Sequence, residues 1–311
     1  MDPGRHAGKL QNCDLCNGPA VIRIREPERR FCGPHFEADL EQRVADTIAA
    51  QCMISPGDRV AVAFSGGKDS SALLSILHRL YSPFRDTSLV AITIDEGIEG
   101  YREETIRAAR RLATRLGIEH SIHSFSSLFG DDLDHLLAGR EKQACTVCGV
   151  LRRRGLAIAA SGVGATKIAT GHNLDDEAQS VLMNFLRGDL PRLVSDTTSH
   201  DAGCFLPRIK PLSGIPEKEI ATYLLVQGCL PDLPECPYTR HALRAEVRTM
   251  LADLEYHHPG TMTRLIASRD QVRLVIRTNR NAPQIQTCRI CGGACREEIC
   301  QVCRILHPDV K

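Results

Sequence analysis

The stretch AVAFSGGKDSSALLSIL, at residues 61–77, decides the fold because a strand, a glycine turn and a helix follow one another within it. An apolar run ends at Phe64, the residues SGGKDS follow at 65–70, and apolar side chains then recur at helical spacing. Glycines let backbone N–H groups approach an anion closely, and a helix N-terminus offers unpaired N–H donors and a positive dipole end. The serines and Lys68 add hydroxyl donors and a charge. The stretch therefore predicts a pyrophosphate-binding loop, although it lacks the G-x-x-x-x-G-K-[ST] spacing of a Walker loop.

Short apolar strands alternate with amphipathic helices on both sides of this loop. The sequence predicts strands at 59–64, 89–94, 118–125 and 166–171, and helices at 36–53, 70–80, 101–116, 149–160 and 175–186. A short extended piece and a helix that begins near Pro216 are expected within 207–228, and further helices at 240–255 and 258–269. Such alternation is typical of an α/β fold, in which a parallel sheet has helices on both faces.

The bulk composition is that of a globular chain. Its 311 residues are 42% hydrophobic and 25% charged, and the formal net charge is +1. This balance does not exclude nucleic acid as a partner, because binding depends on where the charge lies. No apolar run approaches the roughly 20 residues of a membrane span, and the first residues contain no apolar signal-peptide core. We therefore expect a cytoplasmic protein with no membrane partner.

Fourteen cysteines favour metal binding or redox chemistry over disulfides in a reducing compartment. A cluster near each end of the chain has the spacing of a tetrahedral structural zinc site. The expected ligands are Cys13, Cys16, Cys32 and His35 in the first site, and Cys288, Cys291, Cys300 and Cys303 in the second. Cys295 is expected to be a spare thiol. We predict an N-terminal zinc finger at 1–36, a central α/β domain with a helical C-terminal part at 37–283, and a C-terminal zinc ribbon at 284–311.

Three further cysteines lie in the central domain. Cys145-x-x-Cys148 precedes the helix expected at 149–160, and Cys236 lies in LPECPYTRHALR, where proline on both sides stiffens the turn. A lone C-x-x-C pair is compatible with thiol redox chemistry, zinc or iron–sulfur ligation. Three thiols can hold a [4Fe–4S] cluster and leave one iron without a protein ligand. On spacing alone, however, Cys236 is better explained as a small buried apolar residue.

The SGGKDS stretch resembles the loop of the PP-loop ATP pyrophosphatases, which split ATP into AMP and pyrophosphate to adenylate a carbonyl oxygen. ITIDEGI at 92–98 and ATGHNLDDEAQSVLMNFLRG at 169–188 match two further blocks of that family. The resemblance implies a PP-loop domain that binds ATP with Mg²⁺. The ATP-binding residues it implies are Phe64, Ser65, Gly66, Gly67, Lys68, Asp69, Ser70, Ile94, Gly171, His172, Asp175 and Asp176. An acidic helix N-terminus would also account for Asp175 and Asp176.

All these motifs together, in this order along nearly the whole chain, resemble the tRNA 2-thiouridine synthetases of archaea and thermophiles and their eukaryotic cytosolic relatives. The resemblance implies that Cys145, Cys148 and Cys236 ligate a [4Fe–4S] cluster. It further implies that ATP adenylates O2 of a tRNA uridine, at position 34 or 54, and that sulfur then attacks C2. The implied catalytic residues are Cys145, Cys148, Cys236, Asp69, Asp176 and Arg152. A persulfide mechanism on two of these cysteines remains an alternative.

One position departs from the family pattern. The family often has lysine four residues after the second cysteine of the C-x-x-C pair, and this chain has Arg152. Arginine keeps the charge but barely deprotonates, so an acid–base role is not expected, and contact with phosphate or tRNA is.

The resemblance implies tRNA, a sulfur donor and a second copy of the chain as partners. The donor is either a thiocarboxylated ubiquitin-like carrier or free sulfide. Candidate RNA contacts are Arg152, Arg153 and Arg154 beside the C-x-x-C pair, and Arg264, Arg269, Arg273, Arg277 and Arg280 further along. Two other functions remain open: a PP-loop ligase of amidotransferase type that adenylates a small molecule, and a non-catalytic zinc-ribbon module that binds RNA. The ligase would not need the middle cysteines, and the RNA-binding module would not need the SGGKDS loop.

Overall fold

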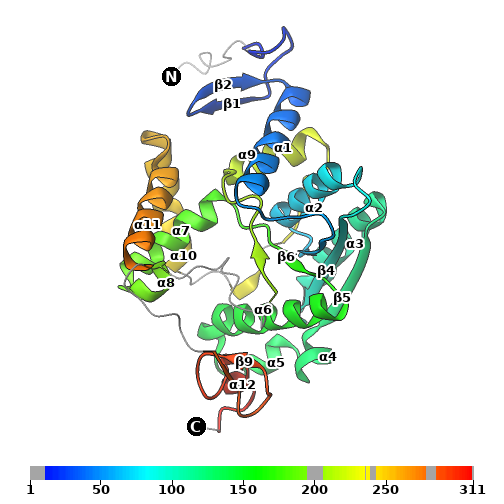
Figure 1. Ribbon diagram of the computed structural model, residues 1–311, viewed down its shortest axis with the longest axis vertical. Helices are drawn as coiled ribbons and strands as arrows, with labels where there is room; N and C mark the ends of the chain where they lie inside the picture. The colour runs from blue at the N-terminus through cyan, green and yellow to red at the C-terminus, as the bar shows by residue number, and fades with distance from the viewer. Residues whose placement is uncertain (1–10, 195–205, 235, 239–242, 278–284, 310–311) are drawn as a thin grey trace, which may run out of the picture.

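A five-stranded parallel sheet forms the centre of the molecule in the computed structural model, which describes residues 11–194, 206–234, 236–238, 243–277 and 285–309 (Figure 1). The strands are β3 (Arg59–Ala63), β4 (Ser88–Asp95), β5 (Glu119–Ser124), β6 (Lys167–Ala169) and β7 (Arg208–Ile209). Their order is β5-β4-β3-β6-β7, and every neighbouring pair is parallel. The order reverses between β3 and β6, and ligands of open α/β sheets bind at such a reversal, beyond the carboxyl ends of the strands.

Helices cover both faces of this sheet, as the sequence predicts. One face packs against α1 (Gly33–Ala50), α2 (Lys68–Tyr81), α3 (Arg102–Leu116) and α9 (Glu217–Val226). The other packs against α4 (Phe125–Phe129), α5 (Leu133–Leu137), α6 (Ala144–Gly162) and α12 (Gln301–Leu306). Within β3, Val60 and Val62 belong to the first core and Ala61 to the second. This alternation follows from the two-residue period of a strand, and it confirms the expected fold class.

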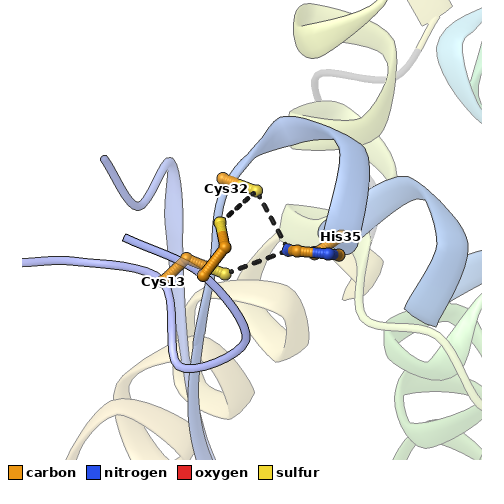
Figure 2. Close-up of side chains that lie close together, drawn as sticks. Cys13, Cys32 and His35 are labelled. Atoms are coloured by element: carbon orange, nitrogen blue, oxygen red, sulfur yellow. Dashed lines mark hydrogen bonds between the residues drawn. The ribbon is translucent and has the colours of Figure 1, made fainter. Parts of the chain in front are cut away.

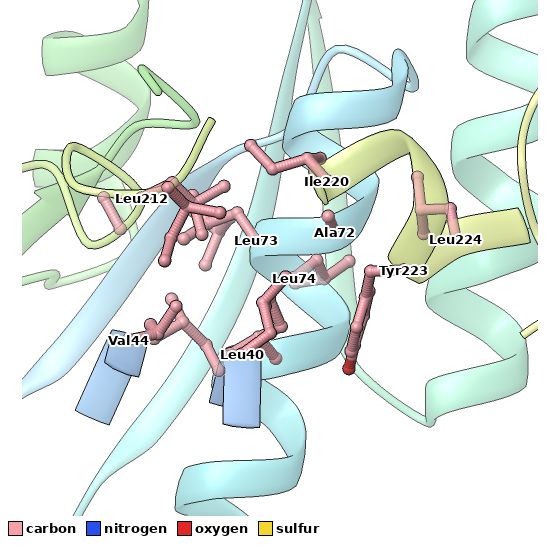
Figure 3. Close-up of a cluster of buried hydrophobic side chains, with 14 of the residues drawn as sticks. Leu40, Val44, Ala72, Leu73, Leu74, Leu212, Ile220, Tyr223 and Leu224 are labelled. Carbon is pink, nitrogen blue, oxygen red and sulfur yellow. The ribbon is translucent and has the colours of Figure 1, made fainter. Parts of the chain in front are cut away.

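The first core is the larger one, and α2 lies at its centre (Figure 3). Leu73 and Leu74 of α2 are fully buried among side chains from α1 and α9, including Leu40 and Tyr223. The hydroxyl of Tyr223 donates a hydrogen bond of 2.7 Å to Glu41 Oε1, so the one polar atom of this ring is satisfied. This packing fixes the N-terminus of α2, which forms the second half of the SGGKDS loop.

A second group of helices lies to one side of the sheet (Figure 1). It comprises α7 (Leu174–Leu186), α8 (Leu190–Val194), α10 (Leu243–His257) and α11 (Thr261–Arg277). Ala178 of α7 packs with Val247 and Leu251 of α10 and with Met262 of α11 in a separate small core. Because α7 begins directly after β6, this group is joined to the carboxyl edge of the sheet.

The two cysteine-rich modules lie at opposite ends of the molecule (Figure 1). The first contains the hairpin of β1 (Ile22–Arg25) and β2 (Glu28–Phe31), and the second contains β8 (Gln286–Thr287), β9 (Ala294–Cys295) and α12. Ile22 and Phe31 of the first module are buried in the same core as Phe36 and Leu40 of α1. The N-terminal module therefore shares its core with the central domain, and the division at residue 36 stays a prediction.

Several elements differ by a few residues from their expected bounds, and two helices differ the most. The helix expected at 149–160 is α6, which begins at Ala144, so Cys145 and Cys148 lie in its first turns and do not precede it. A short 3₁₀ turn, η1 (Glu141–Gln143), leads into α6, and no proline or glycine interrupts the chain before Gly149. Helix α11 continues to Arg277, beyond the expected end at residue 269. Among the residues described, no helix is long and apolar enough to cross a membrane.

Candidate functional site

The SGGKDS loop lies where the strand order reverses. It connects β3 to α2, and residues 170–173 connect the neighbouring strand β6 to α7. The two segments meet at Gly171, where an added Cβ would lie 3.0 Å from the Asp69 carbonyl carbon and 3.1 Å from Ser70 N. Only glycine allows the backbone of the second segment to approach the first turn of α2 this closely.

The loop itself is held by its own serines and by α3. Gly66 has φ +86°, and an added Cβ would lie 2.2 Å from the carbonyl oxygen of Thr105 in α3. Ser65 Oγ accepts a hydrogen bond of 3.3 Å from Gly67 N and lies 3.1 Å from Ser70 Oγ. Ser70 Oγ also donates to the Gly67 carbonyl at 3.0 Å. Ser71 Oγ donates to the Gly66 carbonyl at 3.4 Å, so all three serines shape the loop. Its helix begins at Lys68 and directs its first N–H groups toward the loop.

Lys68 and Asp69 form a charged network at the base of the loop. Lys68 Nζ lies 2.9 Å from Asp69 Oδ2 and 2.7 Å from Glu217 Oε1. Burial opposes the charge of the ammonium group, but the two carboxylates outweigh it and raise the pKa of Lys68. Asn173 Nδ2 donates to Asp69 Oδ1 at 3.0 Å, which ties the second segment to the loop. Lys68 is therefore charged and positioned next to the glycines, as an anion-binding lysine must be.

The two aspartates at the start of α7 have different partners. Asp176 completes a capping box with Asn173, and its Oδ1 accepts a hydrogen bond of 3.1 Å from Arg244 Nη1. Asp175 Oδ2 accepts a hydrogen bond of 2.7 Å from Glu217 N, at the first turn of α9. Burial, together with the nearby carboxylates of Glu217 and Asp176, raises the pKa of Asp175. The position of both aspartates at the start of a helix thus accounts for them structurally. The hydrogen bond that Asp176 accepts is more exposed to solvent than the one that Asp175 accepts.

Three of the expected ATP-binding residues differ in their surroundings. Phe64 and Ile94 are 1% and 6% exposed, and their side chains belong to the two cores of the sheet. Their carbonyl oxygens accept hydrogen bonds of 2.5 Å from Thr93 Oγ1 and Arg102 Nη2 respectively. His172 is exposed, and its Nδ1 lies 2.9 Å from Thr170 Oγ1.

The three middle cysteines gather on the other face of the sheet, at the start of α6. Cys148 is buried and Cys236 half-buried, and both pack against the same core. Cys145 is exposed, and its Sγ donates to the Tyr238 carbonyl at 3.6 Å, which places it beside the loop that carries Cys236. Burial raises the pKa of Cys236, and a charge on Cys145 raises it further. The structure therefore brings together the three thiols that the sequence singles out.

Arg152 lies directly on this cysteine group. Its Nη2 donates to Cys148 Sγ at 3.1 Å, one helical turn away, and its Nε lies 2.6 Å from Glu96 Oε1. Burial raises the pKa of Cys148 to about 11, although Arg152 opposes this rise. A metal ion would be needed to keep this thiol ionised near neutral pH.

The N-terminal cluster has the geometry of a closed tetrahedral metal site (Figure 2). Figure 2 shows Cys13, Cys32 and His35 directed toward one another, with both thiol sulfurs 3.3 Å from His35 Nδ1. Cys16 Sγ lies 3.7 Å from Cys32 Sγ, and the four ligand atoms lie within 4.8 Å of one another. Two sulfurs at ~2.3 Å from a tetrahedral zinc ion are about 3.8 Å apart, so the spacing fits zinc.

The C-terminal cluster repeats this geometry. Cys288, Cys291, Cys300 and Cys303 also lie within 4.8 Å, and Cys291 Sγ is 3.8 Å from Cys300 Sγ. Backbone N–H groups of Cys291 and Cys300 lower the pKa of Cys288 to about 6, which favours the thiolate that a metal requires. Cys295 is outside the set, and its Sγ donates to the Glu297 carbonyl at 2.8 Å.

Some of the arginines expected to contact RNA have partners within the protein. Arg269 is only 13% exposed, and its Nη1 pairs with Glu177 at 3.1 Å. An added Cβ on Gly293 would lie 3.1 Å from Arg154 Nη2, so Arg154 lies against the C-terminal ribbon. Arg264 is exposed. Arg280 and the side chain of Arg277 lie outside the part of the chain that the structure describes.

The structure adds five polar residues that the sequence did not single out: Glu96, Arg102, Asn173, Glu217 and Arg244. The signal for Asn173 was present in the N-x-x-D spacing of a capping box. Glu96 follows Asp95 at the end of an otherwise apolar strand, which could have drawn notice. Arg102, Glu217 and Arg244 come from distant segments, and their spacing in the sequence carries no comparable signal.

Comparisons with known proteins agree with this geometry. The family model described as PP-loop domain matches residues 34–251. The tRNA 2-thiolation protein NcsA of Haloferax volcanii is 36% identical over 95% of this chain and 98% of its own. The cytoplasmic tRNA 2-thiolation protein 1 of Mus musculus is 38% identical over 92% of this chain and 70% of its own.

A solved structure is also similar over nearly its whole length. It is the U34-tRNA thiolase NcsA from Methanococcus maripaludis with its [4Fe–4S] cluster. The TM-score is 0.83 and the sequence identity 31%, and the match covers 94% of this chain and 95% of that one. With the loop, the GHNLDD segment and the cysteines in the expected arrangement, the chain belongs to the PP-loop family of tRNA 2-thiolation proteins.

Proposed function

We propose that the chain is an ATP-dependent tRNA uridine 2-sulfurtransferase. ATP bound at the SGGKDS loop adenylates O2 of a tRNA uridine and releases pyrophosphate. Sulfur then forms a bond to C2, and AMP leaves with the oxygen that it activated. The geometry that carries this proposal is the position of the three middle cysteines beside a pyrophosphate-binding loop. Sequence identity of 31–38% to proteins named for tRNA thiolation supports it.

Each part of the nucleotide has residues suited to it. The N–H groups at the start of α2 and the charge of Lys68 favour the leaving pyrophosphate. The carboxylates of Asp69 and Asp176 are oxygen donors of the kind that Mg²⁺ prefers. Both now pair with cationic or amide groups, so Mg²⁺ would take the place of Lys68 on one and of Arg244 on the other. Gly171 and His172 belong to the segment that meets the loop at the start of α2, and we propose that they contact the nucleotide.

The donor set of the middle cysteines fits a [4Fe–4S] cluster. Three thiols from two segments converge, and they are not one of the close tetrahedral groups, all of whose ligand atoms lie within 4.8 Å. Thiolates that bind different irons of a cluster lie farther apart than those that share one metal ion. Cys145, Cys148 and Cys236 would hold the cluster, which supplies one iron without a protein ligand. Arg152 adds a positive charge at Cys148, beside the place where the sulfur source must approach.

The two terminal clusters fit zinc, and we propose one structural Zn²⁺ in each. Four protein ligands leave no open position on the metal, so these ions stabilise the fold and take no part in the chemistry.

We propose uridine 34 as the target, because the similar solved structure is titled a U34-tRNA thiolase. Sulfide and a thiocarboxylated ubiquitin-like carrier remain the candidate donors, and both deliver sulfur as a nucleophile. We also propose a homodimer and a cytoplasmic location. Phe185 and Leu274 are 67% and 66% exposed on the helical group and are candidates for a dimer contact. The mouse relative's name supports the location.

The decisive experiment is tRNA thiolation by protein purified and reconstituted without oxygen. The chain is incubated with ATP, Mg²⁺, sulfide and unmodified tRNA, and nucleosides are analysed by mass spectrometry while AMP and pyrophosphate are counted. We expect 2-thiouridine at position 34 and one AMP for each thiolated uridine. AMP formation with no thiouridine, from protein that holds its iron, would instead favour a ligase that adenylates a small molecule.

Cysteine variants separate the cluster from the other thiols. Cys236→Ser should lose iron and thiolation while ATP still binds. Cys52→Ser is the matched control, because Cys52 is exposed and lies outside all three cysteine groups. Full thiolation by Cys236→Ser with an intact cluster would exclude Cys236 as a ligand.

A further inference from the structure

A row of three charged side chains, Arg102, Glu96 and Arg152, connects the nucleotide loop to the middle cysteines. Glu96, directly after β4, is 2% exposed and lies between two guanidinium groups. Its Oε1 lies 2.6 Å from Arg152 Nε, and its Oε2 lies 2.6 Å from Arg102 Nε. Both contacts are ion pairs, and neither has the alignment of a hydrogen bond. Burying a carboxylate this deeply costs free energy unless cations accompany it, and two guanidinium groups lie against this one.

At one end of this row of side chains, Arg102 is anchored independently of Glu96. Its Nη2 donates to the Ile94 carbonyl at 2.5 Å, and its Nη1 donates to Thr105 Oγ1 at 2.9 Å and to the Ser65 carbonyl at 3.4 Å. Arg102 therefore joins the end of β4 to the first residue of the SGGKDS loop. It is 4% exposed and would stay in place without Glu96.

At the other end, Arg152 depends on Glu96. The side chain of Arg152 is 50% exposed, and its described contacts are the ion pair with Glu96 and the hydrogen bond to Cys148 Sγ. A half-exposed arginine loses side-chain entropy when it is held in one geometry, and two fixed contacts offset that loss better than the hydrogen bond to Cys148 Sγ alone. Glu96 therefore decides whether Arg152 lies over Cys148 or extends into water.

We propose that Glu96 is a positioning residue that holds Arg152 against the Cys148 sulfur and links this arginine, through Arg102, to the nucleotide loop. The inference rests on the proposed function, because it gives Arg152 its role at the cysteines that bind the cluster. It also explains how arginine can serve where the family often has lysine: the buried carboxylate fixes the planar guanidinium by its Nε and directs Nη2 to the sulfur.

The first test needs no cluster. In nitrogen-15 spectra of the cluster-free chain, the Nε–H signal of Arg152 is assigned by its loss in Arg152→Gln. We expect slow exchange of this proton with water in the wild type and at least tenfold faster exchange in Glu96→Gln, while the Arg102 signal is unchanged. The amide of that variant keeps one oxygen for Arg102 and presents an N–H donor to Arg152, which repels it. Glu99→Gln, which alters an exposed acid in the same segment, is the control and should change neither signal.

The second test measures the reduction potential of the protein with its cluster bound. The direction of the change in potential separates the two possible outcomes. Hydrogen bonds and positive charge at a ligating sulfur raise the reduction potential of a cluster. Loss of the Glu96 charge alone would raise the potential, whereas release of Arg152 from the sulfur lowers it. We expect a lower midpoint potential in Glu96→Gln, a similar decrease in Arg152→Gln, and no further decrease in the double variant.

Several outcomes would overturn the proposal. These are a higher potential in Glu96→Gln, additive effects in the double variant, or unchanged exchange of the Arg152 proton. If Glu96→Gln does not fold, Glu96→Asp retains the charge with a shorter reach and should give an intermediate exchange rate, and an unchanged rate would count equally against the proposal. If the chain takes up no iron, the proposed function fails, and the exchange measurement still decides the role of Glu96.

Discussion

The terminal cysteine clusters and the middle cysteines use the same side chain for different purposes. Each terminal cluster brings four ligands within 4.8 Å, fixed by short hairpins and backbone N–H groups. The middle group has three thiols, and Arg152 donates a hydrogen bond to one of them, Cys148. A closed set of four suits a structural ion, and an open set of three suits chemistry at a metal.

The surroundings of the two kinds of site differ as well. The terminal clusters lie at the two ends of the molecule, away from the nucleotide loop (Figure 1). Two of the middle cysteines, Cys145 and Cys148, lie in the first turns of the helix that covers the sheet beside that loop. The charges of Arg102, Glu96 and Arg152 connect the two sites. The number of ligands and the connection to the loop, not the count of cysteines, therefore separate structure from function in this chain.

The largest expected effect comes from opening a terminal cluster. Cys13→Ser should lose one zinc and lower the free energy of unfolding by at least ~3 kcal/mol, because a structural zinc ion contributes on the order of 10 kcal/mol of binding free energy. Ile22 and Phe31 belong to the main core, so the loss should spread beyond the finger. Zinc analysis and calorimetric unfolding measure it. Equal stability with one zinc fewer would show that the finger and the central domain are independent.

Removing a thiol of the middle group should have the opposite result, a small loss of stability and a large loss of thiolation. Cys148→Ala removes a buried thiol and should lower the free energy of unfolding by only about 1 kcal/mol. Thiolation should fall below detection, and the Kd for ATP should stay within about twofold of wild type. Calorimetry, nucleoside analysis and ATP titration test the three parts. A loss of stability as large as that of Cys13→Ser would erase the distinction between the two kinds of site.

The nucleotide loop can be tested without touching a charge. Gly171→Ala places a Cβ 3.0 Å from the Asp69 carbonyl carbon, so the two segments must move apart. Overpacking of this kind costs ~1–3 kcal/mol, and most of that cost should appear as weaker ATP binding, roughly tenfold in Kd. Gly162→Ala is the matched control, because nothing lies within 4 Å of its added Cβ. If Gly171→Ala bound ATP as tightly as the wild type, the nucleotide would not bind at this junction.

Local patterns predicted the fold and the ligand clusters well. The parallel sheet follows from apolar runs such as 59–64 and 89–94, and both terminal clusters follow from C-x-x-C spacing, which the structure brings within 4.8 Å. The sequence could not show that Cys145 lies inside a helix, because cysteine has no strong preference at a helix start. The sequence places Phe64 and Ile94 among the ATP-binding residues, and because their side chains are buried in the core, only their backbones could serve this role, which stays a prediction.

Contacts between distant segments were beyond the reach of spacing. Glu96 and Arg102 are close in sequence, but Arg152 comes from a distant segment, and the three meet because β4, α3 and α6 pack around the carboxyl end of the sheet. A buried ion pair has no periodicity in the sequence, since its partners are set by topology. The assignments of the nucleotide and cluster ligands remain predictions for the experiments above.

The smallest expected effect is at Cys295, which lies between the two pairs of the C-terminal ribbon but outside its ligand set. Its thiol donates to the Glu297 carbonyl, and serine can donate in the same way. Cys295→Ser should therefore leave the zinc content unchanged and alter the free energy of unfolding by no more than ~0.5 kcal/mol. Zinc analysis beside Cys300→Ser, which should lose the ion, makes the comparison within one module. If Cys295→Ser lost zinc instead, the C-terminal module would choose its four ligands from five cysteines, and it would no longer be the closed site that contrasts with the middle group.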